Sequence, residues 1–551
     1  MMMHDQARAL EISGDSMWSP AKVDAALAFL EQHGMNTLVF HDSDMLNKIT
    51  FPEAYFEPFS SWGASPPRRG ENVIYNCRAY LRSVMAKCAR RGVDFFLELK
   101  EIGFPDEVLE LWPEVVIDGV VCPTHPKWSD FISTRYRETC EAFPQVSGFI
   151  VSVGSPEGRA SLTSHRCRCE RCARTEDAEW HRWIVGSISE AVRPYGKRLV
   201  IREFSYTPQD QKAVIDALTA LPDGIEFCIK PYARDYYLPW PDNTALDSLT
   251  ERPRWLEYDV HGQYFGWGVL PCAVIDDERL RLVTARRKGV SNVLLRTDWE
   301  RINALWALDS FGKVNLATAV ALHREPDADP RRVLARALKD TGVASPELSE
   351  AEAEKLGDVF RRVYEVVLGA LYTAGYVYNV SSMVPNGVRH GWWHMAEQND
   401  LAAWDPAARG RLDVSDPRVV ESLLHEKAEA WSRIDAVVAE LRDWERSGSL
   451  RLPDPAGVGD VIAWSERYLK TFVHTGIVVV LAAAVQAREG GVLSGGLTPA
   501  ERAALERSRE WLADMVASAD GAADRTVHGH QAHLLIGIDH VSRMLREIST
   551  L

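Results

Sequence analysis

Short apolar runs alternate with longer amphipathic segments between residues 8 and 299. Nearly every run ends in polar or charged residues. The runs are RALEISG (8–14), TLVFHD (37–42), FFLELKE (95–101), GFIVSVGSPEG (148–158), RLVIREFSY (198–206), EFCIKPYARD (226–235), RWLEYDVHGQ (254–263) and NVLLRTDW (292–299). Most neighbouring runs are separated by a stretch long enough for a helix, which predicts βα units and a parallel sheet. Eight such units match the size of one (β/α)8 TIM barrel, an α/β fold whose active site lies where the strands end.

The first unit carries the local signals of such a repeat. Ser19 can cap a helix, and Pro20 fits the first helical turn, where a missing N–H costs nothing. Apolar residues follow at helical spacing between positions 23 and 30, and Gly34 is a natural helix stop. The next strand begins within a few residues, as expected for the short connections on this side of a barrel.

The pattern changes after residue 322. The segment HREPDADPRR (323–332) contains two prolines and mixed charge, which is typical of a connection. Helical periodicity then dominates in the segments 333–342, 349–378, 416–445, 457–488, 499–518 and 528–548, with one aromatic loop at 384–395. A chain of 551 residues is too long for one core. We therefore predict a (β/α)8 catalytic barrel at 1–325 and an all-helical C-terminal domain at 330–551.

Composition limits the partners and the compartment. The net charge of -15 argues against nucleic acid and anionic membranes as partners, because phosphate contacts need clustered Lys and Arg. The start, MMMHDQARAL, lacks the regions of a signal peptide, and the apolar run at 476–485 is too short to span a bilayer. An odd number of cysteines, nine, fits a reducing compartment. We expect a cytoplasmic protein, and the large helical domain makes a homodimer plausible.

Glu157 is the first candidate for chemistry. It follows the fourth run directly after a Gly-Ser-Pro turn. A carboxylic acid at this place, partly desolvated by the barrel walls, can have a raised pKa and serve as a general acid. The alternative is a salt bridge at the barrel rim or a glutamate at a helix N-terminus.

Polar residues at the ends of the other runs complete the predicted pocket. The run RWLEYDVHGQ (254–263) places four polar residues on one strand face, which is costly unless they line a pocket. These four are Glu257, Asp259, His261 and Gln263. Further candidates at the other strand ends are His41, Arg202, Lys230, Asp235, Arg296 and Asp298. Carboxylates on opposite walls with cations between them suit the hydrolysis of a glycoside of an acidic sugar.

The span from 148 to 267 resembles the catalytic barrel of the family-67 α-glucuronidases. GFIVSVGSPEG is similar to the family's GF-[LV]-V…SEG segment, which implies that Glu157 is the general acid. IREFSY matches the WRAFVY strand, whose arginine binds the uronate carboxylate, and this implies that role for Arg202. KPYARD keeps the spacing of VKNGPID, which implies a carboxylate-binding Lys230 and a base at Asp235.

Two features depart from that family. WLEYDVHGQYFG aligns without gaps with MMExxxTQEYxG, and it has Gln263 where the family has its second base carboxylate. A glutamine cannot accept a proton from water at neutral pH, so Asp235 would act alone, or Glu257 or Asp259 would replace the lost group. The lysine of the family's acid-bearing strand also has no counterpart in GFIVSV. The resemblance implies a distant relative with a related reaction.

A cysteine cluster follows Glu157. HRCRCERC (165–172) contains three cysteines within six positions, and C-x-C-x-x-C lets three thiolates converge on one tetrahedral ion. The alternative is a set of free surface thiols. The cluster is similar to the structural zinc site of family-42 β-galactosidases, which implies a structural Zn²⁺ with a fourth ligand from elsewhere. The implied ligands are Cys167, Cys169 and Cys172 with Cys122, or, second, His165. No phosphate-binding, HExxH, GxSxG or dinucleotide motif occurs, so no organic cofactor is expected.

The leading hypothesis is an exo-acting glycoside hydrolase that removes a terminal sugar, a uronic acid, with inversion. Glu157 would protonate the leaving oxygen, Asp235 would activate water with help from Glu257, and Arg202 and Lys230 would hold the uronate. One alternative is a retaining glycosidase for a neutral or N-acetylated sugar. Another is a sugar-binding barrel that lost its base with Gln263. The substrate would be an oligosaccharide or glycoside in each case.

Overall fold

A computed structural model of the chain describes residues 6–50, 73–155, 157–298, 306–451, 457–489, 496–519 and 536–549. The chain forms two compact units. One comprises residues 1–235, 242–258 and 284–296, and the other comprises 236–241, 259–283 and 297–551. The boundary near residues 325–330 remains a prediction from the sequence.

Eight parallel strands close into a barrel, which confirms the predicted fold class. They are β1 (Arg8–Ser13), β2 (Thr37–His41), β3 (Asp94–Lys100), β6 (Gly148–Val153), β7 (Arg198–Glu203), β8 (Ile225–Ile229), β9 (Arg254–Asp259) and β10 (Asn292–Arg296). Each strand pairs with its neighbour in chain order, and β10 closes on β1 with Leu10 opposite Leu295. Six strands lie within the predicted apolar runs, β3 and β8 each begin one residue earlier, and several strands end before the polar residues that follow.

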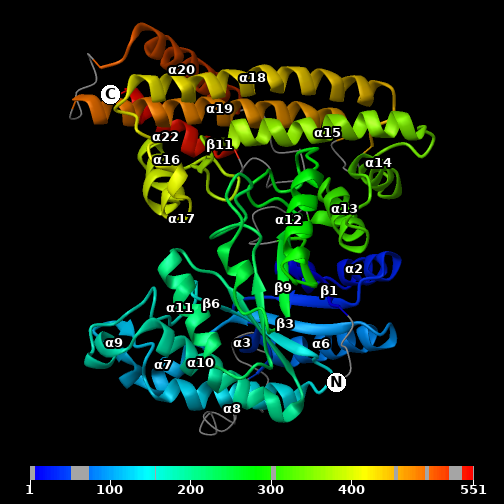
Figure 1. Cartoon of the computed structure of the whole chain (residues 1–551), viewed down its shortest axis with the longest axis vertical. Helices are drawn as coiled ribbons and strands as arrows, with labels where there is room; N and C mark the ends of the chain where they lie inside the picture. Colours follow the sequence, from blue (N-terminus) through cyan, green and yellow to red (C-terminus); the bar gives the residue numbers. More distant parts are fainter. Residues whose placement is uncertain are drawn as a thin grey trace. The chain divides into compact units, whose positions relative to one another are not determined.

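Helices follow the strands as expected for βα units (Figure 1). In α2 (Pro20–His33), the Ser19 hydroxyl accepts a hydrogen bond from the Lys22 N–H, and Gly34 ends the helix at a φ of 60°. These contacts confirm the capping signals of the first unit. The other helices between strands are α1 (Gly14–Met17), α3 (Met45–Ile49), α6 (Val73–Arg90), α7 (Glu107–Leu111), α8 (Lys127–Ala142), α9 (Glu170–Arg174), α10 (Asp177–Val192), α11 (Pro208–Thr219) and α12 (Ile275–Arg287).

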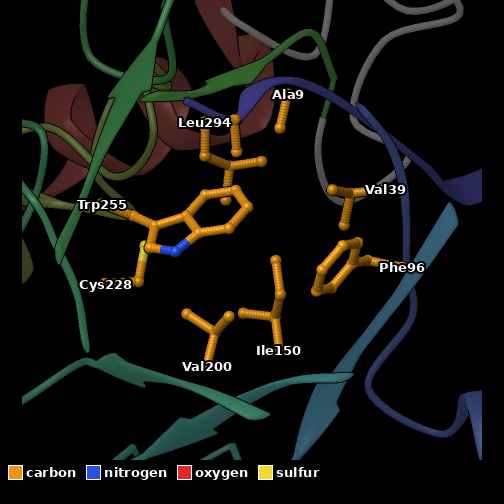
Figure 2. Packing of buried hydrophobic residues seen from close by; sticks show 9 residues of the cluster. Ala9, Val39, Phe96, Ile150, Val200, Cys228, Trp255 and Leu294 are labelled. Carbon is orange, nitrogen blue, oxygen red and sulfur yellow. The ribbon is translucent and has the colours of Figure 1, made fainter. Parts of the chain in front are cut away.

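An apolar layer fills the inside of the barrel (Figure 2). It consists of Ala7, Ala9, Val39, Phe96, Ile150, Val200, Cys228, Trp255 and Leu294, all buried. Phe96 and Trp255 pack edge to face with ring centroids 5.8 Å apart. The buried Trp255 indole N–H donates to Glu226 Oε2 at 2.7 Å, so the largest side chain of the layer leaves no polar atom unpaired.

The second unit is helical, and most of the predicted segments correspond to its helices. These include α13 (Gly312–Arg324), α14 (Pro330–Asp340), α15 (Glu350–Leu371), α18 (Pro417–Arg446), α19 (Val458–Glu489), α20 (Pro499–Ala519) and α22 (Ile538–Ser549). The long helices α15, α18 and α19 lie side by side (Figure 1). Part of the predicted segment 528–548 lies outside the described residues.

Two sequence-based boundaries in this unit are wrong. The helix expected over 349–378 ends at Leu371, because the chain turns into a hairpin of β11 (Tyr372–Thr373) and β12 (Tyr376–Val377) at Gly375, whose φ is 85°. The aromatic loop expected at 384–395 becomes helical at Val388, where α16 (Val388–Trp393) begins.

Within the described ranges, α19 is long and apolar enough to cross a bilayer by length and composition, although the run at 476–485 is short by itself. In its most apolar stretch of 18 residues, 89% of the stretch is buried within the protein. It packs against α15, α18 and α20. This burial is typical of a core helix.

Candidate active site

A polar layer follows the apolar layer towards the carboxyl ends of the strands. Inward-facing residues of a strand recur every second position. Two positions after the apolar layer, seven strands and the residue directly after β8 supply a polar or charged side chain: Glu11, His41, Glu98, Ser152, Arg202, Lys230, Glu257 and Arg296. None of the eight is more than 3% exposed. Seven ionisable groups in one buried layer must pair with one another, because an unpaired buried charge is costly.

Arg202 and Glu257 form the tightest pair of this layer. The guanidinium donates from Nε and Nη2 to the two carboxylate oxygens at 2.5 and 2.8 Å, and Nη1 donates to Ser152 Oγ at 3.0 Å. Burial alone would raise the pKa of Glu257, but Arg202 and then Arg296 outweigh it and lower this pKa to about 2. The uronate-binding role of Arg202 and the base role of Glu257 remain predictions, and each requires this pair to open.

The first three strands, β1, β2 and β3, place a histidine between two carboxylates. His41 Nδ1 lies 2.8 Å from Glu11 and 3.3 Å from Glu98. Burial lowers the pKa of His41 to about 3, so the imidazole is neutral near pH 7. These three side chains are close enough to hold a metal ion. However, Arg202 Nε lies 3.3 Å from Glu98 and Arg296 Nε lies 3.5 Å from Glu11, so guanidinium groups already supply positive charge there.

Glu157 lies on the loop after β6, and its side chain is 32% exposed. The Lys100 ammonium, at the end of β3, lies 2.5 Å from its carboxylate. Burial tends to raise the pKa of Glu157, but Lys100 and then Arg202 and Lys230 overcome it and lower the pKa to about 2. The raised pKa expected from the sequence is therefore wrong. The strand before Glu157, β6, carries no lysine. Lys100 of the neighbouring strand β3 places a cation beside Glu157 instead.

A second lysine–carboxylate pair lies after β8. Lys230 Nζ donates to Asp235 Oδ1 at 2.8 Å and lies 3.4 Å from the centroid of the Phe204 ring. Burial lowers the pKa of Lys230 to about 8, although Asp235 opposes this shift. The preceding Arg234 has a φ of 64°, an uncommon conformation for a residue with a side chain, and its guanidinium lies 4.5 Å from the Tyr206 ring. Such backbone strain is concentrated at functional sites.

The candidates after β9 belong to the second compact unit. The carboxylate of Asp259 accepts hydrogen bonds from the backbone N–H groups of His261, Gly262 and Gln263 at 3.0, 3.1 and 2.7 Å. The chain turns there, and Gly262 has a φ of 97°. The expectation that Glu257, Asp259, His261 and Gln263 share one strand face is therefore wrong beyond Asp259, because β9 ends at that residue.

Side chains of this turn contact other residues of the same unit. Gln263 Nε2 donates to Ser381 Oγ at 3.2 Å, and the His261 ring lies 5.3 Å from the Trp267 ring. Asp298, past the end of β10, is buried in the same unit. The substrate-binding roles of these residues remain predictions.

Several charged residues of this region are not among the site residues predicted from the sequence. Glu11, Glu98, Lys100 and Glu101 all stand in the first and third apolar runs, RALEISG and FFLELKE. The signal that could have found them is the alternation within those runs, because it places Glu98 and Lys100 on the inward face of one strand. Glu101 follows directly after β3.

Glu101 is a buried carboxyl beside the Glu157 loop. A side chain added at Gly158 would lie 3.4 Å from its carboxyl carbon. Burial raises the pKa of Glu101 to about 7, partly offset by its own backbone amide and Lys100. The group therefore holds a proton in the folded protein at pH values where it is ionised in the unfolded chain.

This buried carboxyl predicts a pH dependence of stability. Its contribution is fully present below its ordinary value of 4.5 and is lost as the pH rises through about 7. Relative to Glu101→Gln, the wild type should lose about 3 kcal/mol of unfolding free energy between these pH values, since one pKa unit corresponds to about 1.4 kcal/mol. Urea denaturation at pH 4.5, 6 and 8 measures this difference, with the exposed Glu110→Gln as matched control. A constant difference between wild type and Glu101→Gln would contradict the shift.

The cysteine candidates converge in the first unit. The sulfur atoms of Cys122, Cys167, Cys169 and Cys172 all lie within 4.8 Å of one another. Of the two candidates for the fourth position, the structure brings Cys122 into this group and not His165.

No protein-family model and no curated protein sequence matches this chain. Among solved structures, a GH138 enzyme targeting the pectin rhamnogalacturonan II is similar over 98% of this chain, with a TM-score of 0.61 and 12% identity. The chain spans 66% of the length of that enzyme. This likeness shows a shared fold.

Two further solved structures are less similar to this chain. A family GH115 4-O-methyl-α-glucuronidase with specificity for decorated arabinogalactans has a TM-score of 0.46 and 10% identity, over 98% of this chain and 62% of that one. An O-GlcNAc hydrolase from Thermobaculum terrenum has a TM-score of 0.42 and 10% identity, over 99% and 95%. The structural neighbours are thus glycoside hydrolases of several families.

Proposed function

We propose that this protein is a glycoside hydrolase whose catalytic carboxylates are Glu157 and Asp235. The observation that carries the proposal is the pair of lysine-held carboxylates at the carboxyl ends of the barrel strands, next to a fully buried charged layer. A (β/α)8 barrel has its active site at this end. Two carboxyl groups are also the usual machinery for cleaving a glycosidic bond.

Exposure distinguishes the three candidate carboxylates. The side chain of Glu157 is 32% exposed and that of Asp235 is 9% exposed, whereas Glu257 is fully buried against Arg202. Glu157 is therefore the carboxylate most open to a sugar, and Asp235, although buried, keeps more exposed surface than Glu257. Glu257 is a positioning residue that holds Arg202 in the layer below.

The ionised state of Glu157 changes its proposed role. A group with a pKa of about 2 carries no proton near pH 7, so it suits a base or a nucleophile better than a proton donor. We assign the base or nucleophile role to Glu157 and, by elimination, the proton-donor role to Asp235, which requires that Asp235 first take up the proton of the hydrogen-bonded Lys230 ammonium or one from water. This reverses the roles that the resemblance to the family-67 enzymes implies.

An acidic sugar, a uronic acid at a chain terminus, is the proposed substrate. Lys230 stands directly after β8, where its ammonium donates to Asp235 Oδ1 and to the Arg234 carbonyl and lies over the Phe204 ring, so it is a cation beside one of the two proposed catalytic carboxylates. We assign the sugar carboxylate to Lys230, which would exchange its single hydrogen bond to Asp235 Oδ1 for one to the sugar, whereas Glu257 holds Arg202 through two nitrogens. The GH138 neighbour, which shares the fold, targets a pectin.

A substrate panel tests the function. The purified protein is incubated with nitrophenyl glycosides and uronides and with pectic oligosaccharides, and the released sugar is measured. Release of a terminal uronic acid supports the proposal, and release of only neutral or N-acetylated sugars overturns the substrate class. Binding of a sugar without any release would support the non-catalytic alternative. NMR of the first-formed anomer distinguishes inversion, which we propose, from retention.

Lys230→Ala should impair the hydrolysis of a uronide selectively. A hydrogen bond to a charged group contributes about 1.5–3 kcal/mol, so KM for a uronide should rise about ten- to a hundredfold. KM for the matching neutral glycoside should change far less. Lys230→Arg, which keeps the charge, is the matched control and should retain part of the preference. Equal losses on both substrates would show that Lys230 does not bind the sugar carboxylate.

The cytoplasmic location and the homodimer are further proposals that rest on the sequence composition and on the helical unit.

A further inference from the structure

Four cysteines from two distant segments meet in the barrel unit. Cys122 precedes α8, and the other three surround the start of α9 after β6. Cys122 Sγ lies 3.7 Å from Cys169 Sγ and 3.6 Å from Cys172 Sγ. Cys167 Sγ lies 3.2 Å from Cys172 Sγ. All four thiols are free, since these separations far exceed a disulfide bond of about 2.05 Å.

These distances match the edges of a metal–thiolate tetrahedron. A zinc–sulfur bond of about 2.3 Å in a tetrahedral site places its sulfur atoms about 3.8 Å apart. The three separations of 3.2, 3.6 and 3.7 Å lie close to that value. Four thiols fill the coordination of the ion and leave no position for water, so the site has the closed form of a structural metal.

Groups around the sulfurs hold them in place. The Cys172 N–H donates to Cys169 Sγ at 3.4 Å, so a backbone amide supports one thiolate as the first turn of α9 forms. The Trp128 indole N–H donates to the Cys122 carbonyl at 2.8 Å. The Trp180 indole N–H donates to the Pro123 carbonyl at 2.9 Å. Two buried indoles therefore fix the segment that brings in the distant ligand.

Local charge also favours thiolates. Four thiolates around a divalent ion leave a formal double negative charge, which nearby cations offset. The segment 165–174 contains Arg166, Arg168, Arg171 and Arg174, of which Arg166 also pairs with Asp177 and Arg174 with Glu170. Arg166 Nη1 donates to the Cys172 carbonyl at 2.6 Å and so lies directly at the cluster.

We propose that Cys122, Cys167, Cys169 and Cys172 bind one structural Zn²⁺. The ion joins the connection before α8 to the loop between β6 and α9, and that loop begins next to Glu157. The described residues of 154–169 contain no helix or strand, so a crosslink at the far end of this segment reduces its conformational freedom. The zinc thereby stiffens the wall that carries Glu157.

Metal analysis of the wild type tests the proposal directly. Protein purified under reducing conditions from zinc-supplemented medium should contain about one zinc per chain. X-ray absorption at the zinc edge should show four sulfur neighbours near 2.3 Å. Protein without stoichiometric metal overturns the site, as does an intact disulfide among these cysteines. Iron in place of zinc overturns the choice of metal.

The zinc content of cysteine variants distinguishes the four proposed ligands from a thiol outside the cluster. Cys122→Ser and Cys169→Ser should each lose most of the bound zinc. Cys77→Ser is the matched control, because Cys77 is a partly exposed free thiol outside the cluster, and it should keep the full zinc content. Removal of zinc from the wild type with a chelator should lower Tm, and adding zinc back should restore it. Full zinc content in Cys122→Ser, or a Tm that the chelator leaves unchanged while it removes the zinc, would refute the proposed structural site.

Discussion

Replacing Glu157 by glutamine should lower kcat by about 10²–10⁴-fold on any glycoside that the wild type hydrolyses, the usual range for loss of a catalytic acid or base. The amide keeps the shape of the side chain but cannot accept a proton or attack a sugar. The fold should survive, because the side chain is one-third exposed on a loop. Steady-state kinetics with nitrophenyl substrates measure the loss, and thermal melting shows that the variant is folded.

Leaving groups distinguish the role of Glu157 from that of Asp235. The kcat of Asp235→Asn should recover with an activated leaving group such as dinitrophenol, which needs no proton, whereas that of Glu157→Gln should not. Glu114→Gln is the matched control, since Glu114 is another exposed carboxylate paired with a lysine, Lys127. Recovery of Glu157→Gln instead would restore the general-acid role that the sequence predicts. Equal kcat in wild type and Glu157→Gln would remove Glu157 from the mechanism.

Glu257→Ala should lower the free energy of unfolding by about 3–5 kcal/mol, the usual cost of leaving one member of a buried ion pair unpaired. Arg202 would lose both of its short hydrogen bonds to a carboxylate, and it is almost fully buried. Urea denaturation followed by circular dichroism measures the change.

A double variant distinguishes the contribution of the ion pair to the free energy of unfolding from the cost of leaving one buried charge unpaired. Arg202→Met combined with Glu257→Leu should cost far less than the sum of the two single variants, because replacing both charges with apolar groups avoids an unpaired ion. The exposed pair Lys212 and Asp216 is the matched surface control. Additive losses in the double variant would show that the two residues do not depend on each other.

Glu157 and Asp235 follow β6 and β8, as the apolar runs predict, and their catalytic roles remain proposals. The apolar strand before Glu157 predicts a raised pKa, because nothing in the local sequence places a cation beside this carboxyl group. The lowered pKa comes from Lys100, which is on another strand and close only after the barrel closes. The fourth cysteine likewise joined the cluster through folding, because Cys122 belongs to a different βα connection.

The sequence by itself determined the barrel, because a strand buried on both sides requires an apolar run and each βα repeat leaves its own helix signals. It also determined which residues stand at the carboxyl ends of the strands. Only the tertiary structure decided which charges pair there. Closure of the barrel brings side chains of β3, β7, β9 and β10 into one buried layer. Each charged group there pairs with a nearby group of opposite charge, because the pairing offsets the free-energy cost of removing the charge from water. Local pattern therefore specifies the positions of these groups, and three-dimensional proximity specifies their protonation and partners.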